Sequence, residues 1–207
     1  QRNYKYEVTD ELHKWLTTYR GVSDRVSREF ADSLGISRPV ANRAIAPTGT
    51  IGMLAGTTTG IEPLYAVAYK RRYLTNGNKW KYQYNVYSIA VELIERYDLE
   101  PDAIETASDL ANDYERRIKL QADIQDYVDM SISSTINLPS IDNQNFNTTD
   151  FATTLAKYAS RLRGFTCYPD GARGGQPLTK VDYSTAVEKL GEEFEEGVEV
   201  NDICLIT

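Results

Sequence analysis

The sequence predicts an α/β protein in which helices flank mostly parallel strands. An amphipathic helix over Arg116–Ser131 is followed by an alternating segment, Ile132–Leu138, that ends at Pro139. A second amphipathic helix, capped by Thr149 or Asp150, precedes a short apolar segment over Phe165–Tyr168. Strands that alternate with helices along a chain usually lie parallel in one sheet, so this order predicts parallel strands joined by helices.

The N-terminal segment, Thr9–Leu34, predicts two helices. Apolar and aromatic residues recur at helical spacing on both sides of Gly21, which we expect to break the segment into a helical hairpin. Gly35 should end the second helix. The simplest role of Trp15 and Tyr19 is packing, although exposed aromatic residues also mark interfaces, so a partner-binding role stays open.

The middle of the chain predicts a β-hairpin followed by a helix. Leu64–Tyr69 reads as an extended segment, and Asn76-Gly77 is a strong tight-turn signal between Arg72–Leu74 and Lys79–Tyr82. Apolar residues at helical spacing predict a helix over Tyr87–Tyr97. Near the end of the sequence, we expect a helix over Ser184–Phe194 and a solvated acidic run from Glu192 to Glu199.

Composition describes a globular protein and excludes several functional classes. The 207 residues carry a formal net charge of −7, which disfavours general binding to nucleic-acid backbones despite the basic run Lys70-Arg71-Arg72. No apolar stretch approaches the ~20 residues of a membrane span, and the first residues have no signal-peptide core. Cys167 and Cys204 form neither a disulfide framework nor a zinc site, so we expect a reducing cytoplasm. The sequence does not begin with Met, and we expect a processed chain or a fragment.

One segment has the composition of an anion site. A short apolar strand, Ala44-Ile45-Ala46, leads into the turn Pro47-Thr48-Gly49-Thr50, and a helix-compatible run begins at Ile51. Backbone N–H groups at the start of a helix converge on one point, and Gly49 lets a ligand approach the backbone closely. The threonine hydroxyls add two donors, which makes a phosphate or diphosphate site without a lysine. An ordinary threonine-capped helix is the alternative.

Three motifs in order resemble the catalytic subunit of adenosylcobalamin-dependent (class II) ribonucleotide reductases. They are APTGTIGMLAGTTTGIEPLYAVAYKRR, then QADIQ through SISSTINLP, and finally GFTCYPDGAR with GQPL. The resemblance covers roughly Arg43 to Leu178. It implies three parts: a helical segment over 1–42, part of the reductase barrel over 43–178, and an acidic tail over 179–207.

The resemblance implies a ten-stranded α/β barrel, of which this chain resembles the C-terminal part. In that family the loop that corresponds to Ala46, Pro47, Thr48, Gly49, Thr50 and Ile51 holds the substrate phosphates. The reaction reduces ribonucleoside di- or triphosphates through a cysteine radical, which adenosylcobalamin initiates. The radical-bearing cysteine and its neighbours have no counterpart in this sequence, so we assign no catalytic residue and no metal ligand.

The expected partner is therefore an N-terminal reductase part that carries the cysteines, joined to this chain or separate from it as in a split enzyme. The complete enzyme, rather than this chain alone, is expected to bind adenosylcobalamin. Cys204 is alone near the end of the sequence and cannot perform dithiol exchange by itself. Two alternatives stay open: a fragment of an iron-dependent (class I) reductase, and a non-catalytic interaction domain that keeps the fold. A homo-oligomer is also compatible with the sequence.

Overall fold

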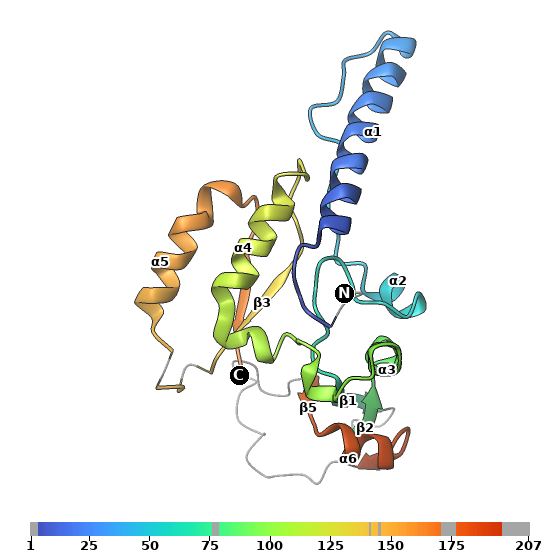
Figure 1. The fold of residues 1–207 in the computed structure, drawn as a ribbon, viewed down its shortest axis with the longest axis vertical. Helices are drawn as coiled ribbons and strands as arrows, with labels where there is room; N and C mark the ends of the chain where they lie inside the picture. The colour runs from blue at the N-terminus through green and yellow to red at the C-terminus, as the bar shows by residue number, and fades with distance from the viewer. Residues whose placement is uncertain (1–3, 76–78, 141, 145, 171–176, 196–207) are drawn as a thin grey trace.

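A layer of parallel strands covered by helices forms the left-hand part of the molecule in the view of Figure 1. The computed structural model describes residues 4–75, 79–140, 142–144, 146–170 and 177–195. Strand β3 (Thr135–Leu138) pairs in parallel with β4 (Thr166–Pro169), and a parallel bridge joins Ile45 to Ile132. The predicted helix–strand–helix–strand order and its parallel pairing are thus confirmed. The described residues form part of a sheet and not a closed barrel.

Helices α4 (Tyr114–Gln125) and α5 (Thr148–Tyr158) lie together against this layer (Figure 1). Alternation along β3 turns Ile136 and Leu138 towards the helices, where they pack with Ile118 of α4 and Tyr158 of α5. The same alternation turns Thr135 and Asn137 to the opposite face of β3. That face borders the candidate site.

A second sheet is antiparallel, so parallel pairing is confined to the first layer. Its strand order is β5–β1–β2–β6. The central strands, β1 (Ala68–Thr75) and β2 (Lys79–Val86), form the predicted hairpin with longer strands than the sequence indicated. The hairpin turn lies outside the described residues. The edge strands are β5 (Leu178–Lys180) and β6 (Glu193–Glu195).

Short helices connect these elements. Helix α2 (Gly49–Leu54) stands off from the body, and α3 (Ser88–Tyr97) confirms the predicted helix. Helix α6 (Tyr183–Glu188) is shorter than predicted, because the chain turns at Gly191 and Phe194 enters β6. The described part of the acidic run therefore forms an edge strand whose carboxylates remain exposed. Three short 3-10 helices complete the fold: Pro101–Ala103, Asp109–Asp113 and Ala159–Arg161.

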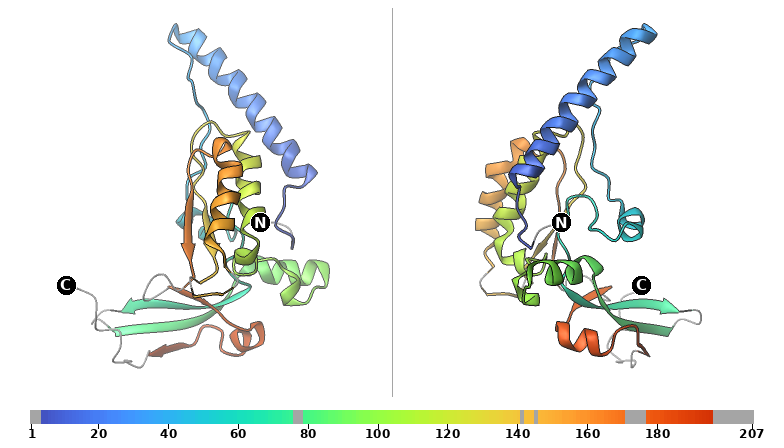
Figure 2. Two further views of the ribbon diagram at one scale, coloured as in Figure 1. Left: turned by 90° about the vertical axis from the view of Figure 1, so that its left-hand side faces the viewer. Right: turned by 45° about the vertical axis from the view of Figure 1, so that its right-hand side comes forward.

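The predicted N-terminal hairpin is wrong, because α1 (Asp10–Leu34) is one continuous helix. A glycine within a helix costs only about 1 kcal/mol and removes no backbone hydrogen bond, so Gly21 does not end a helix of 25 residues. Gly35 does end it, in the left-handed conformation, as predicted. Helix α1 projects well beyond the rest of the molecule (Figure 2).

Two other helix boundaries differ from the sequence prediction. Asn147 caps α5 by accepting from the N–H groups of Thr149 and Asp150, so neither of the two predicted residues is the cap. Helix α4 ends at Gln125 rather than Ser131, and the Gln125 side chain then donates to the carbonyls of the following turn. Among the helices that the structure describes, none combines the length and apolarity needed to cross a bilayer.

Candidate functional site

The candidate phosphate loop occupies the segment between Ile45 and Gly60. Thr48 adopts a left-handed backbone conformation, and its carbonyl accepts the first hydrogen bond of α2, from the N–H of Gly52 at 2.8 Å. The N–H groups of Gly49, Thr50 and Ile51 therefore have no partner within the helix. All six predicted site residues, Ala46 to Ile51, are exposed. Because α2 has only six residues, these N–H groups and the threonine hydroxyls would contribute more to binding an anion than the helix dipole would.

The two ends of the loop meet at a narrow neck. The N–H of Gly60 donates to Oγ1 of Thr48 at 3.2 Å, so this hydroxyl links the two ends of the loop and still has its proton to donate. Gly60 has a φ of 52°, and a Cβ there would lie 3.4 Å from the carbonyl oxygen of Ala46 and 3.5 Å from that of Ser133. The neck thus needs glycine for both its conformation and its close packing.

Helix α2 packs against the returning half of the loop through a glycine. Gly52 is buried, and a Cβ at this position would lie 2.6 Å from Cγ2 of Thr59 and 3.4 Å from its Cα. By contrast, a Cβ at Gly49 would meet nothing within 4 Å. Gly52 therefore sets the packing of the loop, whereas Gly49 leaves open space where a ligand would approach.

A carboxylate directly after the neck ties the loop to the parallel layer. Glu62 accepts from the N–H of Thr135 at 2.5 Å and from Nη2 of Arg117 at 2.9 Å. Arg117 is buried on α4, with 2% of its side chain exposed, and donates also to the carbonyl of Thr135 at 2.8 Å. One carboxylate thus joins the loop, the start of β3 and the first turn of α4.

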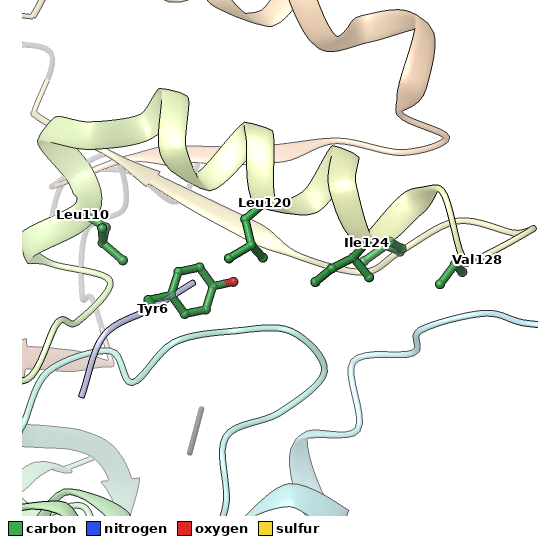
Figure 3. Close-up of a cluster of buried hydrophobic side chains, with 6 residues drawn as sticks. Tyr6, Leu110, Leu120, Ile124 and Val128 are labelled. Carbon is green, nitrogen blue, oxygen red and sulfur yellow. The ribbon is translucent and has the colours of Figure 1, made fainter. Parts of the chain in front are cut away.

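Tyr6 joins the same structure from the N-terminal segment. Its ring packs with Leu110 and Leu120 in a buried apolar cluster (Figure 3), and the Arg117 guanidinium lies 5.1 Å from the ring centroid. Its hydroxyl donates to the carbonyl of Ile61. Burial raises the pKa of Tyr6 to about 12, against the lowering effect of Arg117, so the phenol stays protonated as a donor.

A cavity of about 650 Å³ lies beside the loop, a size that suits a small organic ligand. Its wall includes Gly49 of the predicted site, the hydroxyl-bearing run Thr57–Thr59, and Glu62. Thr135 and Asn137 of β3 face it, as the strand alternation requires. Of the six predicted residues, only Gly49 lines this cavity.

Tyrosines and a cation form another part of the cavity wall. Tyr69 and Tyr87 lie with ring centroids 4.6 Å apart, and Arg71 of β1 also lines the wall. Burial, together with the neighbouring tyrosines, raises the pKa of Tyr87 to about 12, so it stays neutral. The sequence pattern predicts no site role for Glu62, Asn137 or these tyrosines. Alternation in the predicted strand 132–138 was the one signal that could have brought Asn137 to this face.

Cys167 and His13, the cysteine and histidine that the structure describes, are engaged in packing and in a contact with a tyrosine rather than with each other. Cys167 is half-buried against the α4–α5 cluster, and burial raises the pKa of its thiol, which disfavours a reactive thiolate. Nδ1 of His13 on α1 lies 2.8 Å from the Tyr127 hydroxyl. Within the described ranges no group of three or more histidine, cysteine, aspartate or glutamate residues could hold a metal ion. Cys204 lies outside the described residues.

Comparisons with known proteins confirm the predicted resemblance. Residues 38–168 match the family model described as ribonucleotide reductase, barrel domain. A solved B12-dependent (class II) ribonucleotide reductase aligns with a TM-score of 0.61 and 14% identity, over 86% of this chain and 26% of that one. At this identity the structural likeness shows the fold alone.

Curated relatives agree with the family model. A vitamin B12-dependent ribonucleoside-diphosphate reductase of Mycobacterium tuberculosis (strain CDC 1551 / Oshkosh) is 30% identical over 190 residues, which are 81% of this chain and 26% of the relative. A reductase with the same description from Thermoplasma acidophilum is 30% identical over 91% of this chain and 26% of its own length. A putative adenosylcobalamin-dependent ribonucleoside-triphosphate reductase of Mycobacterium phage D29 is 26% identical over 80% of this chain and 28% of its own length. This chain thus spans about a quarter of the length of these relatives. Because the family model matches more than half of it, the chain belongs to the ribonucleotide reductase family and contains part of its barrel domain.

Proposed function

We propose that this chain supplies the substrate-phosphate-binding part of an adenosylcobalamin-dependent ribonucleotide reductase. The observation that carries the proposal is the loop over residues 46–51, which lies within the matched range 38–168 and presents three backbone N–H groups without helical partners. The hydroxyls of Thr48 and Thr50 supply further donors to an anion. The ligand is the di- or triphosphate of a ribonucleotide.

The relatives support the cobalamin-dependent class over the iron-dependent alternative, since all those described above are named for B12 or adenosylcobalamin. The cofactor generates the radical in such enzymes. A cavity of about 650 Å³ is of the size that takes a drug-sized ligand and is small for a corrin with its adenosyl and nucleotide groups. We therefore assign cofactor binding to the complete enzyme and derive no step from this chain's residues.

The chain's own contribution is to bind and orient the nucleotide. Neutral donors at the loop hold the phosphates, and the polar face of β3 with the tyrosine wall borders the space beside them. The radical and reducing cysteines would come from an N-terminal reductase part.

Exposed apolar surface supports that partner. Helix α1 carries a stripe of exposed large side chains, here called the α1 stripe: Trp15, Tyr19, Val22, Val26, Phe30 and Leu34. Contiguous apolar surface of this kind marks a site that another polypeptide covers. Ile51 and Leu54 of α2 are likewise exposed, next to the phosphate loop. The same stripe would be the working surface of a non-catalytic interaction domain, the alternative function.

Binding of nucleotide separates the two functions. Titration calorimetry would measure the affinity of a ribonucleoside diphosphate for the chain, alone and together with an N-terminal reductase part. Thr48→Val and Thr50→Val each remove a neutral donor worth about 0.5–1.5 kcal/mol, so each should weaken binding roughly 2- to 12-fold. Thr153→Val, on the exposed face of α5, is the matched control and should change nothing. Absence of binding in both settings would favour the interaction domain.

A further inference from the structure

Glu62 lies where three separate parts of the chain meet the phosphate loop. It is two residues beyond the neck at Gly60, and its two carboxylate oxygens hold Thr135 of β3 and Arg117 of α4. The Tyr6 hydroxyl holds the adjacent carbonyl of Ile61. The end of the loop is thus fixed at two successive residues.

The start of the loop is fixed to the same point. Oγ1 of Thr48 accepts from the N–H of Gly60, and Ile45 bridges to Ile132, three residues before Thr135. Any shift of Glu62 relative to β3 would therefore move the neck, and with it the residues that present their N–H groups to the ligand. The neck has little room to rearrange, because the backbone is closely packed there: a Cβ placed on Gly60 would lie 3.4 Å from the carbonyl oxygen of Ala46 and 3.5 Å from that of Ser133.

We infer that Glu62 is a positioning residue for the substrate phosphates, acting through the neck of the loop without touching the ligand itself. The inference rests on the proposed phosphate-binding function. The negative charge of Glu62 is needed for this role, because Arg117 is a buried cation with 2% of its side chain exposed. A neutral residue of the same shape keeps one acceptor for Thr135 but leaves the guanidinium without its carboxylate.

Glu62→Gln tests the inference, and Asp123→Asn is the matched control. Asp123 is also a partly buried carboxylate of α4, with 29% of its side chain exposed, and it accepts from an arginine, Arg161, at 2.9 Å. Its partners Arg161 and Lys119 lie outside the loop and outside the N-terminal segment that holds Ile61, and Asp123 does not line the cavity. Both variants therefore lose a carboxylate–arginine contact, but only the first removes one that supports the loop.

Two measurements would be made on the folded chain. The first is the affinity for inorganic diphosphate by calorimetry, which Glu62→Gln should weaken roughly 3- to 10-fold, since even a displacement of about 1 Å can weaken a positioned contact strongly. The second is hydrogen exchange at the bonded amides of Gly52, Thr57 and Gly60, which should become faster in the same variant. Asp123→Asn should leave both unchanged.

The outcomes separate this inference from the proposed function. If Glu62→Gln changes neither readout, or if Asp123→Asn changes both equally, Glu62 does not position the loop. If the unsubstituted chain binds no diphosphate, alone or with an N-terminal reductase part, the proposed function fails. The exchange rates then decide whether Glu62 holds the loop in place.

Discussion

Glu105 fastens the N-terminal segment to the body of the molecule. Its carboxylate accepts from the N–H of Tyr6 at 2.8 Å and forms an ion pair with Arg116, and Lys5 lies 3.5 Å away. Burial alone would raise the pKa of this carboxyl group, but the hydrogen bonds from Arg116 and Tyr6 and the nearby cations outweigh it and lower the pKa. The charged form is therefore the one that stabilises the fold.

Glu105→Gln should reduce the free energy of unfolding by about 1–2 kcal/mol at pH 7, a value discounted because Arg116 is partly exposed. The folded pKa is depressed, so this stabilisation is complete above the ordinary carboxyl pKa near 4.3 and is lost as pH falls through the folded value. Urea unfolding of both proteins at pH 7 and at about pH 3 measures this, and the difference between them should shrink at the lower pH. A difference that is equal at both pH values would contradict the account.

At the scale of the element, two glycines of the phosphate loop, Gly52 and Gly49, serve different purposes. Gly52→Ala places a methyl group 2.6 Å from Cγ2 of Thr59, so α2 must shift away from the returning half of the loop, which contains Thr59. We expect a loss of about 1–3 kcal/mol in unfolding free energy and weaker binding of diphosphate. Both quantities can be measured on one preparation by denaturant titration and calorimetry.

Gly49→Ala is the companion variant. Its methyl group meets no protein atom within 4 Å, so stability should stay within about 0.5 kcal/mol of the unsubstituted chain. The methyl group would nevertheless stand where the ligand approaches the backbone, and binding should fall. Unchanged diphosphate binding by this variant would show that the ligand lies elsewhere.

The elements that the sequence predicted well are those whose pattern is local. Alternation over 132–138 and helical spacing in the flanking segments were enough to predict the parallel layer, in which β3 pairs with β4 and the helices α4 and α5 pack against the strands. The hairpin of β1 and β2 followed from Asn76-Gly77. The continuity of α1 through Gly21 was missed, because a local glycine penalty is outweighed by a long helical ladder.

The site was predictable only in part, for a related reason. The loop over 46–51 has a recognisable local composition, whereas Glu62 has its role through Thr135 and Arg117, which are 73 and 55 residues away in sequence. No periodicity marks such a contact. The tyrosine wall of the cavity similarly comes from β1 and the start of α3, which meet only in the folded chain.

On the scale of the whole molecule, the α1 stripe and the exposed residues of α2 are the surfaces on which we propose that the N-terminal reductase part docks. Helix α1 is held to the body as far as Asp24, for example by Arg20 and by Arg43, while its C-terminal end projects away from it (Figure 2). Arg43 donates to Asp24 at 2.5 Å and to Asp129 at 2.8 Å, which fixes the direction of the helix. The stripe is thus presented by a rigid element rather than by a loose one.

Phe30→Glu tests whether this surface receives the N-terminal reductase part. Phe30 is 63% exposed, so the substitution should change the melting temperature of the isolated chain little. If the aromatic ring is a central contact, its loss should weaken association by about 2 kcal/mol or more, roughly 30-fold in Kd. The measurement is calorimetry or sedimentation with an N-terminal part that yields reductase turnover when combined with this chain. Val187→Glu, on α6 at the opposite end of the molecule and 49% exposed, is the matched control (Figure 1). If the unsubstituted chain, Phe30→Glu and Val187→Glu all associate equally strongly with the N-terminal part, the α1 stripe does not bind that partner.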